Sequence, residues 1–173
     1  TLSKNLTKIP NKAFMLCFVL DNVKIPEKVT EIGNQAFTYC RALSELIIPK
    51  KLEKMGDNAF SNCGKLQSIE LPDTITTIGS GALRDTGLLK VKLPANAKFV
   101  TLNKAVFSGC SALAEVIIPE NVTSIGDAGN VVSDGTFYGC TSLEEIKLPS
   151  KLTKIGSGAF AKCNKLKTIV IPD

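Results

Sequence analysis

The chain has 173 residues and a formal net charge of +5, and 44% of its residues are hydrophobic. It contains no histidine, so the Ser-His and Cys-His pairs of hydrolytic enzymes are excluded, and we predict that the chain is not an enzyme. Arg41 and Arg84 are its only arginines, and its lysines are spread over the chain, which argues against nucleic-acid binding. No apolar run approaches the roughly 20 residues of a membrane-spanning helix, so we expect no direct membrane insertion.

A unit of 23 residues repeats along the whole chain. Each unit reads Pro-x-x-(Val/Leu/Ile)-x-x-Ile-Gly-x-x-Ala-Phe-x-x-Cys-x-x-Leu-x-x-Ile-x-(Ile/Leu), followed by the next proline. The closing prolines are Pro26, Pro49, Pro72, Pro94, Pro119, Pro149 and Pro172. A period this short indicates a solenoid, in which each coil buries its apolar side by stacking on its neighbours. We therefore predict a single domain over residues 1–173.

The segments within a unit predict a β-rich coil. Residues 145–148, before a closing proline, alternate polar and apolar, which is typical of a short strand with Ile146 and Leu148 inward. The Val-Thr-x-Ile-Gly segment after the proline is interpreted as a second short strand or an extended turn, and its glycine, such as Gly33, is expected to adopt a positive φ. The Ala-Phe-x-x-Cys segment is predicted to be one helical turn. Stacked coils would then form a parallel sheet with one exposed face.

This pattern resembles the BspA-type (Treponema pallidum-type) leucine-rich repeat, and the resemblance covers the whole chain. It implies a β-rich α/β solenoid, a right-handed leucine-rich-repeat superhelix of about seven coils with short helical turns. It also implies an exported protein that is secreted or displayed at the cell surface. Relatives of this kind include adhesins that bind host extracellular-matrix or plasma proteins. The ligand does not follow from the resemblance, because the repeated positions serve packing.

Six cysteines occupy one column of the repeat, and Thr86 fills the remaining place. The cysteines are Cys17, Cys40, Cys63, Cys110, Cys140 and Cys163. A single inward column predicts free, buried thiols rather than disulfides, because parallel side chains give an unfavourable disulfide dihedral. The chain has neither a Cys-x-x-Cys pair nor a histidine, so zinc is disfavoured, and we expect no cofactor or metal.

The fourth and sixth repeats depart most from the pattern. Leu83 replaces phenylalanine and Thr86 replaces cysteine in the fourth repeat, which is one residue short. The sixth repeat carries about seven extra residues between Gly126 and Phe137. Insertions in solenoids lie on one face, often the binding face. The insertion is therefore either a tolerated surface loop or part of a binding site.

Outward-facing strand positions form the candidate protein-binding row. It mixes charged side chains with exposed aliphatic ones, a composition suited to a protein partner. Lys90 and Lys92 lie in the irregular fourth repeat, with Arg84 and Lys98 close in sequence, and could form a small basic patch. A solvated lysine-rich face is the alternative. The candidate residues are Glu45, Ile47, Glu70, Lys90, Lys92, Glu115, Ile117, Glu145 and Lys147. We predict an adhesin-like protein-binding module; the alternatives are a passive structural spacer within a larger surface protein and, more weakly, an intracellular scaffold.

The two ends of the chain predict further contacts. The first repeat is already under way at residues 6–9, and neither end resembles the polar cap that solenoids need. We therefore expect a fragment of a longer exported protein. The first repeat is also apolar where its sister repeats are polar, at Met15, Leu16, Phe18 and Val19. Such a cluster predicts contact with a neighbouring repeat or domain at the N-terminal end, a capping element or a second copy.

Overall fold

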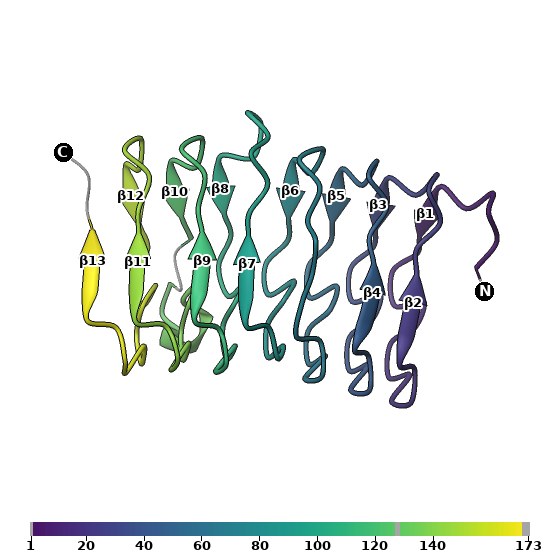
Figure 1. The fold of residues 1–173 in the computed structure, drawn as a ribbon, viewed down its shortest axis with the longest axis horizontal. Helices are drawn as coiled ribbons and strands as arrows, with labels where there is room; N and C mark the ends of the chain where they lie inside the picture. The colour runs from purple at the N-terminus through teal and green to yellow at the C-terminus, as the bar shows by residue number, and fades with distance from the viewer. Residues whose placement is uncertain (1, 127–128, 171–173) are drawn as a thin grey trace.

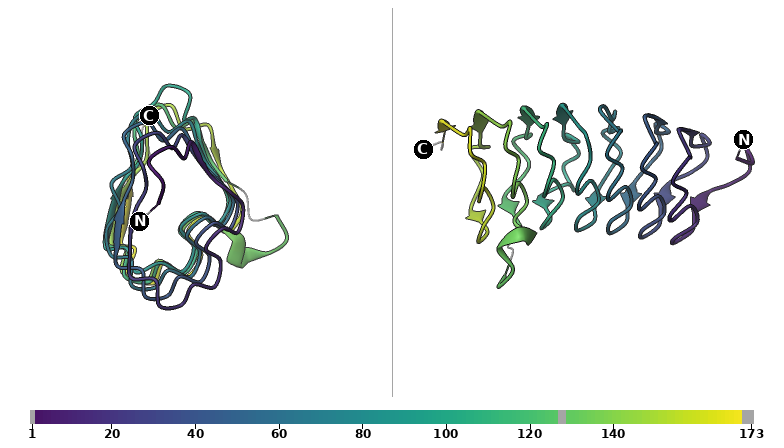
Figure 2. Two further views of the ribbon diagram at one scale, coloured as in Figure 1. Left: turned by 90° about the vertical axis from the view of Figure 1, so that its right-hand side faces the viewer. Right: turned by 90° about the horizontal axis from the view of Figure 1, so that it is seen from below.

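The computed structural model describes residues 2–126 and 129–170, which wind into seven stacked coils of roughly 23 residues. The coils follow one another along a single axis, so the first and last coils lie at opposite ends (Figure 1). Viewed along that axis, the coils superimpose as a closed outline (Figure 2). The solenoid expected from the repeat is confirmed.

Each coil contributes to one or both of two rows of short parallel strands (Figure 1). The first row follows the prolines and consists of β1 (Lys8–Ile9), β3 (Glu31–Ile32), β5 (Lys54–Met55), β6 (Thr77–Ile78), β8 (Thr101–Leu102), β10 (Ser124–Ile125) and β12 (Lys154–Ile155). The second row precedes the prolines and consists of β2 (Asn22–Lys24), β4 (Glu45–Ile47), β7 (Lys90–Lys92), β9 (Glu115–Ile117), β11 (Glu145–Lys147) and β13 (Thr168–Val170). The segment after each proline, for which a turn was the alternative, is therefore a strand in these coils.

Both rows are interrupted where the spacing of the prolines changes. The first row has no pairing between β6 and β8 among the described residues. In the second row, the described residues 68–70 of the third coil form no strand, and β9 and β11 are adjacent without a hydrogen-bonded ladder. These breaks flank the shortened fourth coil and the extended fifth and sixth coils, because a change in coil length shifts the backbone groups that would pair. The strand predicted to carry Glu70 is thus absent.

The Ala-Phe-x-x-Cys segments are successive tight turns, which corrects the helical turn expected from the sequence. In the second coil, Gln35 has φ 57° and Tyr39 has φ 63°, values that a right-handed helix cannot contain. The N–H of Cys40 donates to the carbonyl of Phe37 at 3.1 Å, whereas the N–H of Phe37 donates to Ala59 of the next coil at 2.7 Å. The only helix in the described part of the chain is the 3₁₀ helix η1 (Val132–Asp134).

A glycine follows β3, β5, β6 and β10 because a side chain has no room there, and not because φ is positive. Gly33 is not among the residues with positive φ, contrary to expectation. A Cβ built on Gly33 would lie 2.6 Å from the backbone nitrogen of Asn11 in the preceding coil. The side chain of Asn11 instead accepts a hydrogen bond from the N–H of Asn34 at 2.8 Å. The glycine therefore allows two coils to approach closely.

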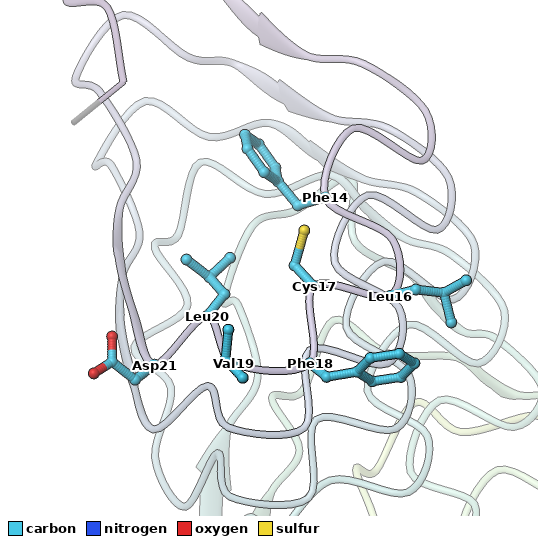
Figure 3. A pocket seen from close by; sticks show the side chains of 7 residues that line it. All are labelled: Phe14, Leu16, Cys17, Phe18, Val19, Leu20 and Asp21. Carbon is cyan, nitrogen blue, oxygen red and sulfur yellow. The ribbon is translucent and has the colours of Figure 1, made fainter.

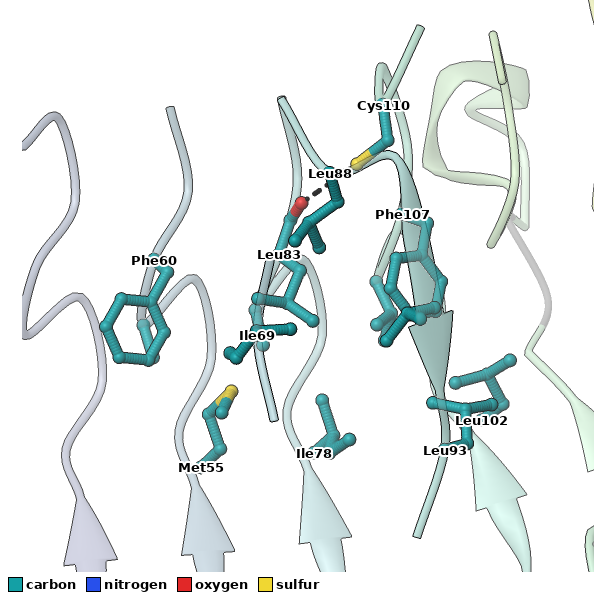
Figure 4. Close-up of a cluster of buried hydrophobic side chains, with 14 of the residues drawn as sticks. Met55, Phe60, Ile69, Ile78, Leu83, Leu88, Leu93, Leu102, Phe107 and Cys110 are labelled. Carbon is teal, nitrogen blue, oxygen red and sulfur yellow. Dashed lines mark hydrogen bonds between the residues drawn. The ribbon is translucent and has the colours of Figure 1, made fainter. Parts of the chain in front are cut away.

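A stack of phenylalanine rings runs through the core and is broken once. Phe14, Phe37 and Phe60 stack with ring centroids 5.1 Å apart, and Phe107, Phe137 and Phe160 stack at 5.5 and 5.3 Å. The buried Leu83 lies between the two stacks (Figure 4). The fourth coil therefore divides the aromatic core into two halves.

The thiols of the cysteine column donate hydrogen bonds to backbone carbonyls in the core. The thiol of Cys63 donates to the carbonyl of Phe37 in the preceding coil at 3.2 Å, and that of Cys110 donates to Leu83 at 3.1 Å. Burial raises the pKa of the Cys63 thiol to about 12, so the thiol stays protonated at neutral pH. Every cysteine of the described chain is free, as expected, but Cys17 is exposed because no described coil covers the first one.

Candidate functional site

The second row of strands presents most of the candidate binding residues on one face. The register pairs Lys90 with Glu115 and Lys92 with Ile117 across β7 and β9. Lys90 Nζ lies 3.2 Å from Glu115 Oε2, so this lysine is neutralised by an exposed ion pair. Ile117 remains 43% exposed beside that pair. The face at this point is therefore an aliphatic side chain bordered by a compensated charge pair rather than an open basic patch.

The other candidate residues divide into two groups. Glu145 and Lys147 lie on β11, next to β9, and extend the same face. Glu45 and Ile47 lie on β4, which pairs with β2 and is separated from β7 by the third coil. Glu70 is exposed in that coil, outside any strand. The structure thus brings together the residues of β7, β9 and β11 and sets the earlier ones apart.

A shallow groove of about 420 Å³ lies between β9 and β11, where the two strands are not joined by a ladder. Its lining residues are Ala114, Glu115, Val116, Ile117, Ile118, Glu120, Glu145, Lys147 and Leu148. The N–H and hydroxyl of Ser150 both donate to Glu120 Oε2 at 2.8 Å, which holds the pKa of this carboxyl below its ordinary value. Sequence reasoning missed this groove; the signal was the 30-residue spacing from Pro119 to Pro149.

The insertion of the sixth repeat is anchored to the preceding coils by ion pairs. Its residues 127 and 128 lie outside the described part of the chain. Asp134, in η1, is 3.2 Å from Arg84 Nη1 and 3.2 Å from Lys104 Nζ. The segment protrudes from the side of the coil opposite the second-row strands (Figure 2) and exposes Val131 and Val132. Arg84 of the fourth coil therefore forms an ion pair with the insertion and does not add to a basic patch with Lys90.

The first coil presents an open apolar end. A hollow of about 600 Å³ is lined by Phe14, Leu16, Cys17, Phe18, Val19, Leu20 and Asp21 (Figure 3). Phe18 is 50% exposed and Val19 is 89% exposed, whereas Met15 is half-buried. The guanidinium of Arg41, in the next coil, lies 5.5 Å from the centre of the Phe18 ring. Three of the four residues predicted for an interface are thus accessible.

The described residues contain no group of histidine, cysteine, aspartate or glutamate side chains arranged to hold a metal ion. Within the same residues, no helix is long and apolar enough to cross a membrane.

Comparison with known proteins agrees with this architecture. A leucine-rich repeat protein from Bacteroides ovatus is 30% identical, with a TM-score of 0.88 over 96% of the chain and 41% of that protein. The Treponema pallidum leucine rich repeat protein is 30% identical, with a TM-score of 0.84 over 94% of the chain and 72% of that protein. A leucine rich cell surface protein from Faecalibacterium prausnitzii is also 30% identical, with a TM-score of 0.63 over 98% of the chain and 52% of that protein.

The chain thus spans less than half of the Bacteroides ovatus protein. None of the curated proteins matches it. The sequence profile of the BspA type leucine rich repeat region matches residues 1–101 and 103–173 in six copies. The chain therefore belongs to the BspA-type leucine-rich-repeat family.

Proposed function

We propose that this chain is an adhesin-like protein-binding module, secreted or displayed at a cell surface, and that it binds its partner through the face formed by β7, β9 and β11. The observation that carries the proposal is the groove between β9 and β11, which places the exposed Ile117 beside Glu145 and Lys147. An exposed aliphatic side chain bordered by charged ones suits the partly apolar, polar-rimmed composition of protein interfaces. The Faecalibacterium prausnitzii relative, described as a cell surface protein, supports the location.

The proposed partners are proteins, including host extracellular-matrix or plasma proteins. The exposed ion pair of Lys90 with Glu115 contributes little affinity by itself, about 0–1 kcal/mol. The charges of this pair would instead orient a partner of complementary charge. Binding at a single shallow groove is expected to be weak, and several linked modules would raise the avidity.

Binding of the purified chain to immobilised fibronectin, fibrinogen and unrelated extracellular proteins tests the proposal. The variant Ile117→Asp places a charge in the groove and is expected to abolish saturable binding. The matched control Val132→Asp introduces the same charged residue at an exposed valine of the insertion, on the opposite side. Circular dichroism of both variants shows whether the fold is kept.

Loss of binding in Ile117→Asp alone supports the strand face. Loss in Val132→Asp alone would move the site to the insertion and overturn the proposal. Saturable binding to none of the proteins would favour the alternative function, a passive spacer that holds other domains away from the cell.

A further inference from the structure

Successive coils are joined by three rows of backbone hydrogen bonds. Two of them are the strand rows, and the third, the turn row, joins the tight turns of the Ala-Phe-x-x-Cys segments. In the turn row the N–H of Phe37 donates to Ala59 at 2.7 Å, and the N–H of Leu83 donates to Val106 at 3.1 Å. Every pair of successive coils in the described chain has such a bond. The turn row is therefore continuous, whereas both strand rows are interrupted.

The second row is interrupted where the third coil meets the fourth. Residues 68–70 of the third coil form no strand, so β7 has no ladder on this side. One backbone bond remains here among the described residues, from the N–H of Leu89 to the carbonyl of Gln67 at 3.1 Å. Between the same coils the first row keeps its ladder, in which Lys54 aligns with Thr77. The two coils are thus held along the first row and the turn row, and along the second row by a single bond.

Two core contacts between these coils are also missing. Leu83 of the fourth coil stands where a phenylalanine would stack on Phe60 (Figure 4). Thr86 stands in the cysteine column, and its hydroxyl donates to the carbonyl of Leu83 in its own coil at 2.9 Å. The thiol of Cys63, by contrast, donates to Phe37 of the preceding coil at 3.2 Å. The third and fourth coils therefore lack both the ring stacking and the thiol hydrogen bond that recur elsewhere in the core.

No other pair of successive coils in the described chain lacks the second-row ladder, the ring stacking and the thiol bond together. The second and third coils have no such ladder, but Phe37 stacks on Phe60 with ring centroids 5.1 Å apart. The fourth and fifth coils have no ring stacking, but β7 pairs with β9. The fifth and sixth coils again lack the ladder, but Phe107 stacks on Phe137 at 5.5 Å. Local opening is easiest where such contacts are fewest.

The insertion of the sixth repeat holds together the coils on the far side of this interface. Asp134 pairs with Arg84 of the fourth coil and with Lys104 of the fifth. The Ser108 hydroxyl of the fifth coil donates to the carbonyl of Ser133 at 2.7 Å. No ion pair among the described residues joins the third coil to the fourth. The fourth to sixth coils therefore form one block, and the third coil lies outside it.

We propose that the solenoid bends at the interface between the third and fourth coils. The first row and the turn row act as the pivot, and residues 68–70 move away from β7 as the second row opens. Hinges of this kind need only a few residues to change their backbone angles. The bend moves Ile47, on β4, relative to the face formed by β7, β9 and β11, so the outward surface of the second row changes its curvature. The inference is independent of the proposed binding function.

Distances between spin labels in the whole chain test the proposal. In a Cys17→Ser background, Asn22→Cys and Thr168→Cys place labels on second-row strands of the first and seventh coils. Lys8→Cys and Lys154→Cys place labels on first-row strands of the same coils and are the matched control. The remaining native cysteines are buried, so they stay unlabelled in the folded chain. Double electron–electron resonance is expected to give the broader distance distribution for the second-row pair, and equal widths would overturn the proposal.

A variant that restores the repeated residues tests the cause of the bend. Leu83→Phe combined with Thr86→Cys supplies the missing ring and the missing thiol. It is expected to narrow the distance distribution of the second-row pair and to leave that of the first-row pair unchanged. Circular dichroism shows whether this variant keeps the fold. An unchanged second-row distribution in the folded variant would contradict the proposal.

Amide hydrogen exchange of the unsubstituted chain, measured by NMR, locates the bend without any change to the core. The N–H of Leu89 bonds to Gln67 across the proposed hinge. The N–H groups of Ser44 and Ala114 make the corresponding bonds between coils whose second-row ladders are intact, both at 2.9 Å. The protection factor of Leu89 is expected to be about tenfold lower than those of Ser44 and Ala114. Equal protection at the three amides would show that this interface opens no more readily than its neighbours, and the proposal would be wrong.

Discussion

Arg84 Nη1 lies 3.2 Å from Asp134 Oδ1, so the irregular fourth coil and the insertion of the sixth repeat are in direct contact. The same carboxylate lies 3.2 Å from Lys104 Nζ of the fifth coil. The neighbouring Ser108 hydroxyl donates to the carbonyl of Ser133 at 2.7 Å. Departures that are separate in the sequence thus combine into one structural unit, in which the fourth and fifth coils hold a protruding segment of the sixth.

Removal of the charge on Asp134 should loosen that segment. The variant Asp134→Asn loses both ion pairs, which are partly exposed, so the free energy of unfolding should fall by only about 0.5–1 kcal/mol. Amide hydrogen exchange at residues 129–135 should nevertheless rise clearly, because the local anchor is lost. Glu53→Gln is the control, since Glu53 makes no ion pair among the described residues. Unchanged exchange in Asp134→Asn would contradict this account of the insertion.

Thiol labelling should separate Cys17 from the other cysteines. Cys17 is exposed, whereas Cys40, Cys63, Cys110, Cys140 and Cys163 are buried. Because the thiolate is the reactive form and burial disfavours it, a maleimide should label one thiol in the native chain and six after denaturation. Intact-mass spectrometry measures the number of labels. Rapid native labelling of Cys63 would show that the coils separate in solution.

Alkaline pH should destabilise the chain through the same column. Burial raises the pKa of Cys40 and Cys110 to about 11 and that of Cys63 to about 12, from 9.0. The folded state therefore keeps protons that the unfolded state loses above pH 9, so the stabilisation is complete below that pH and declines up to about pH 12. Chemical denaturation at several pH values measures the decline. The variant Cys63→Thr introduces the residue that the fourth coil carries at Thr86. It should make the free energy of unfolding fall less steeply with pH, and an unchanged fall would show that Cys63 does not contribute to it.

The sequence was sufficient to predict the features that recur in every unit. Apolar residues recur in successive repeats at the positions of Ile32, Phe37 and Leu43, which predicts that these side chains face inward. All three are buried. The local pattern around Phe37 is equally consistent with a helical turn. The structure adopts tight turns there because the N–H of Phe37 pairs with Ala59, 22 residues later, and not within its own segment. Such a partner exists only after the coils have stacked.

Features that occur once could not be predicted in the same way. The pairing of Arg84 with Asp134 joins positions 50 residues apart, and no repeat relates them. The groove beside Ile117 arises because β9 and β11 fail to form a ladder, which depends on the length of the intervening coil.

The repeated glycine offers the sharpest test of coil packing. A Cβ at Gly56 would lie 2.6 Å from the backbone nitrogen of Asn34, so Gly56→Ala forces two coils apart. We expect the free energy of unfolding to fall by about 1–3 kcal/mol, the usual cost of overpacking. Gly64 has no atom within 4 Å of the corresponding Cβ position and is not at positive φ. Gly64→Ala should therefore raise the free energy of unfolding by about 0.4–1 kcal/mol, because it restricts the unfolded chain. Urea denaturation measures the free energy of unfolding of both variants. Equal effects at Gly56 and Gly64 would show that close approach of the coils is not the reason for glycine at position 56.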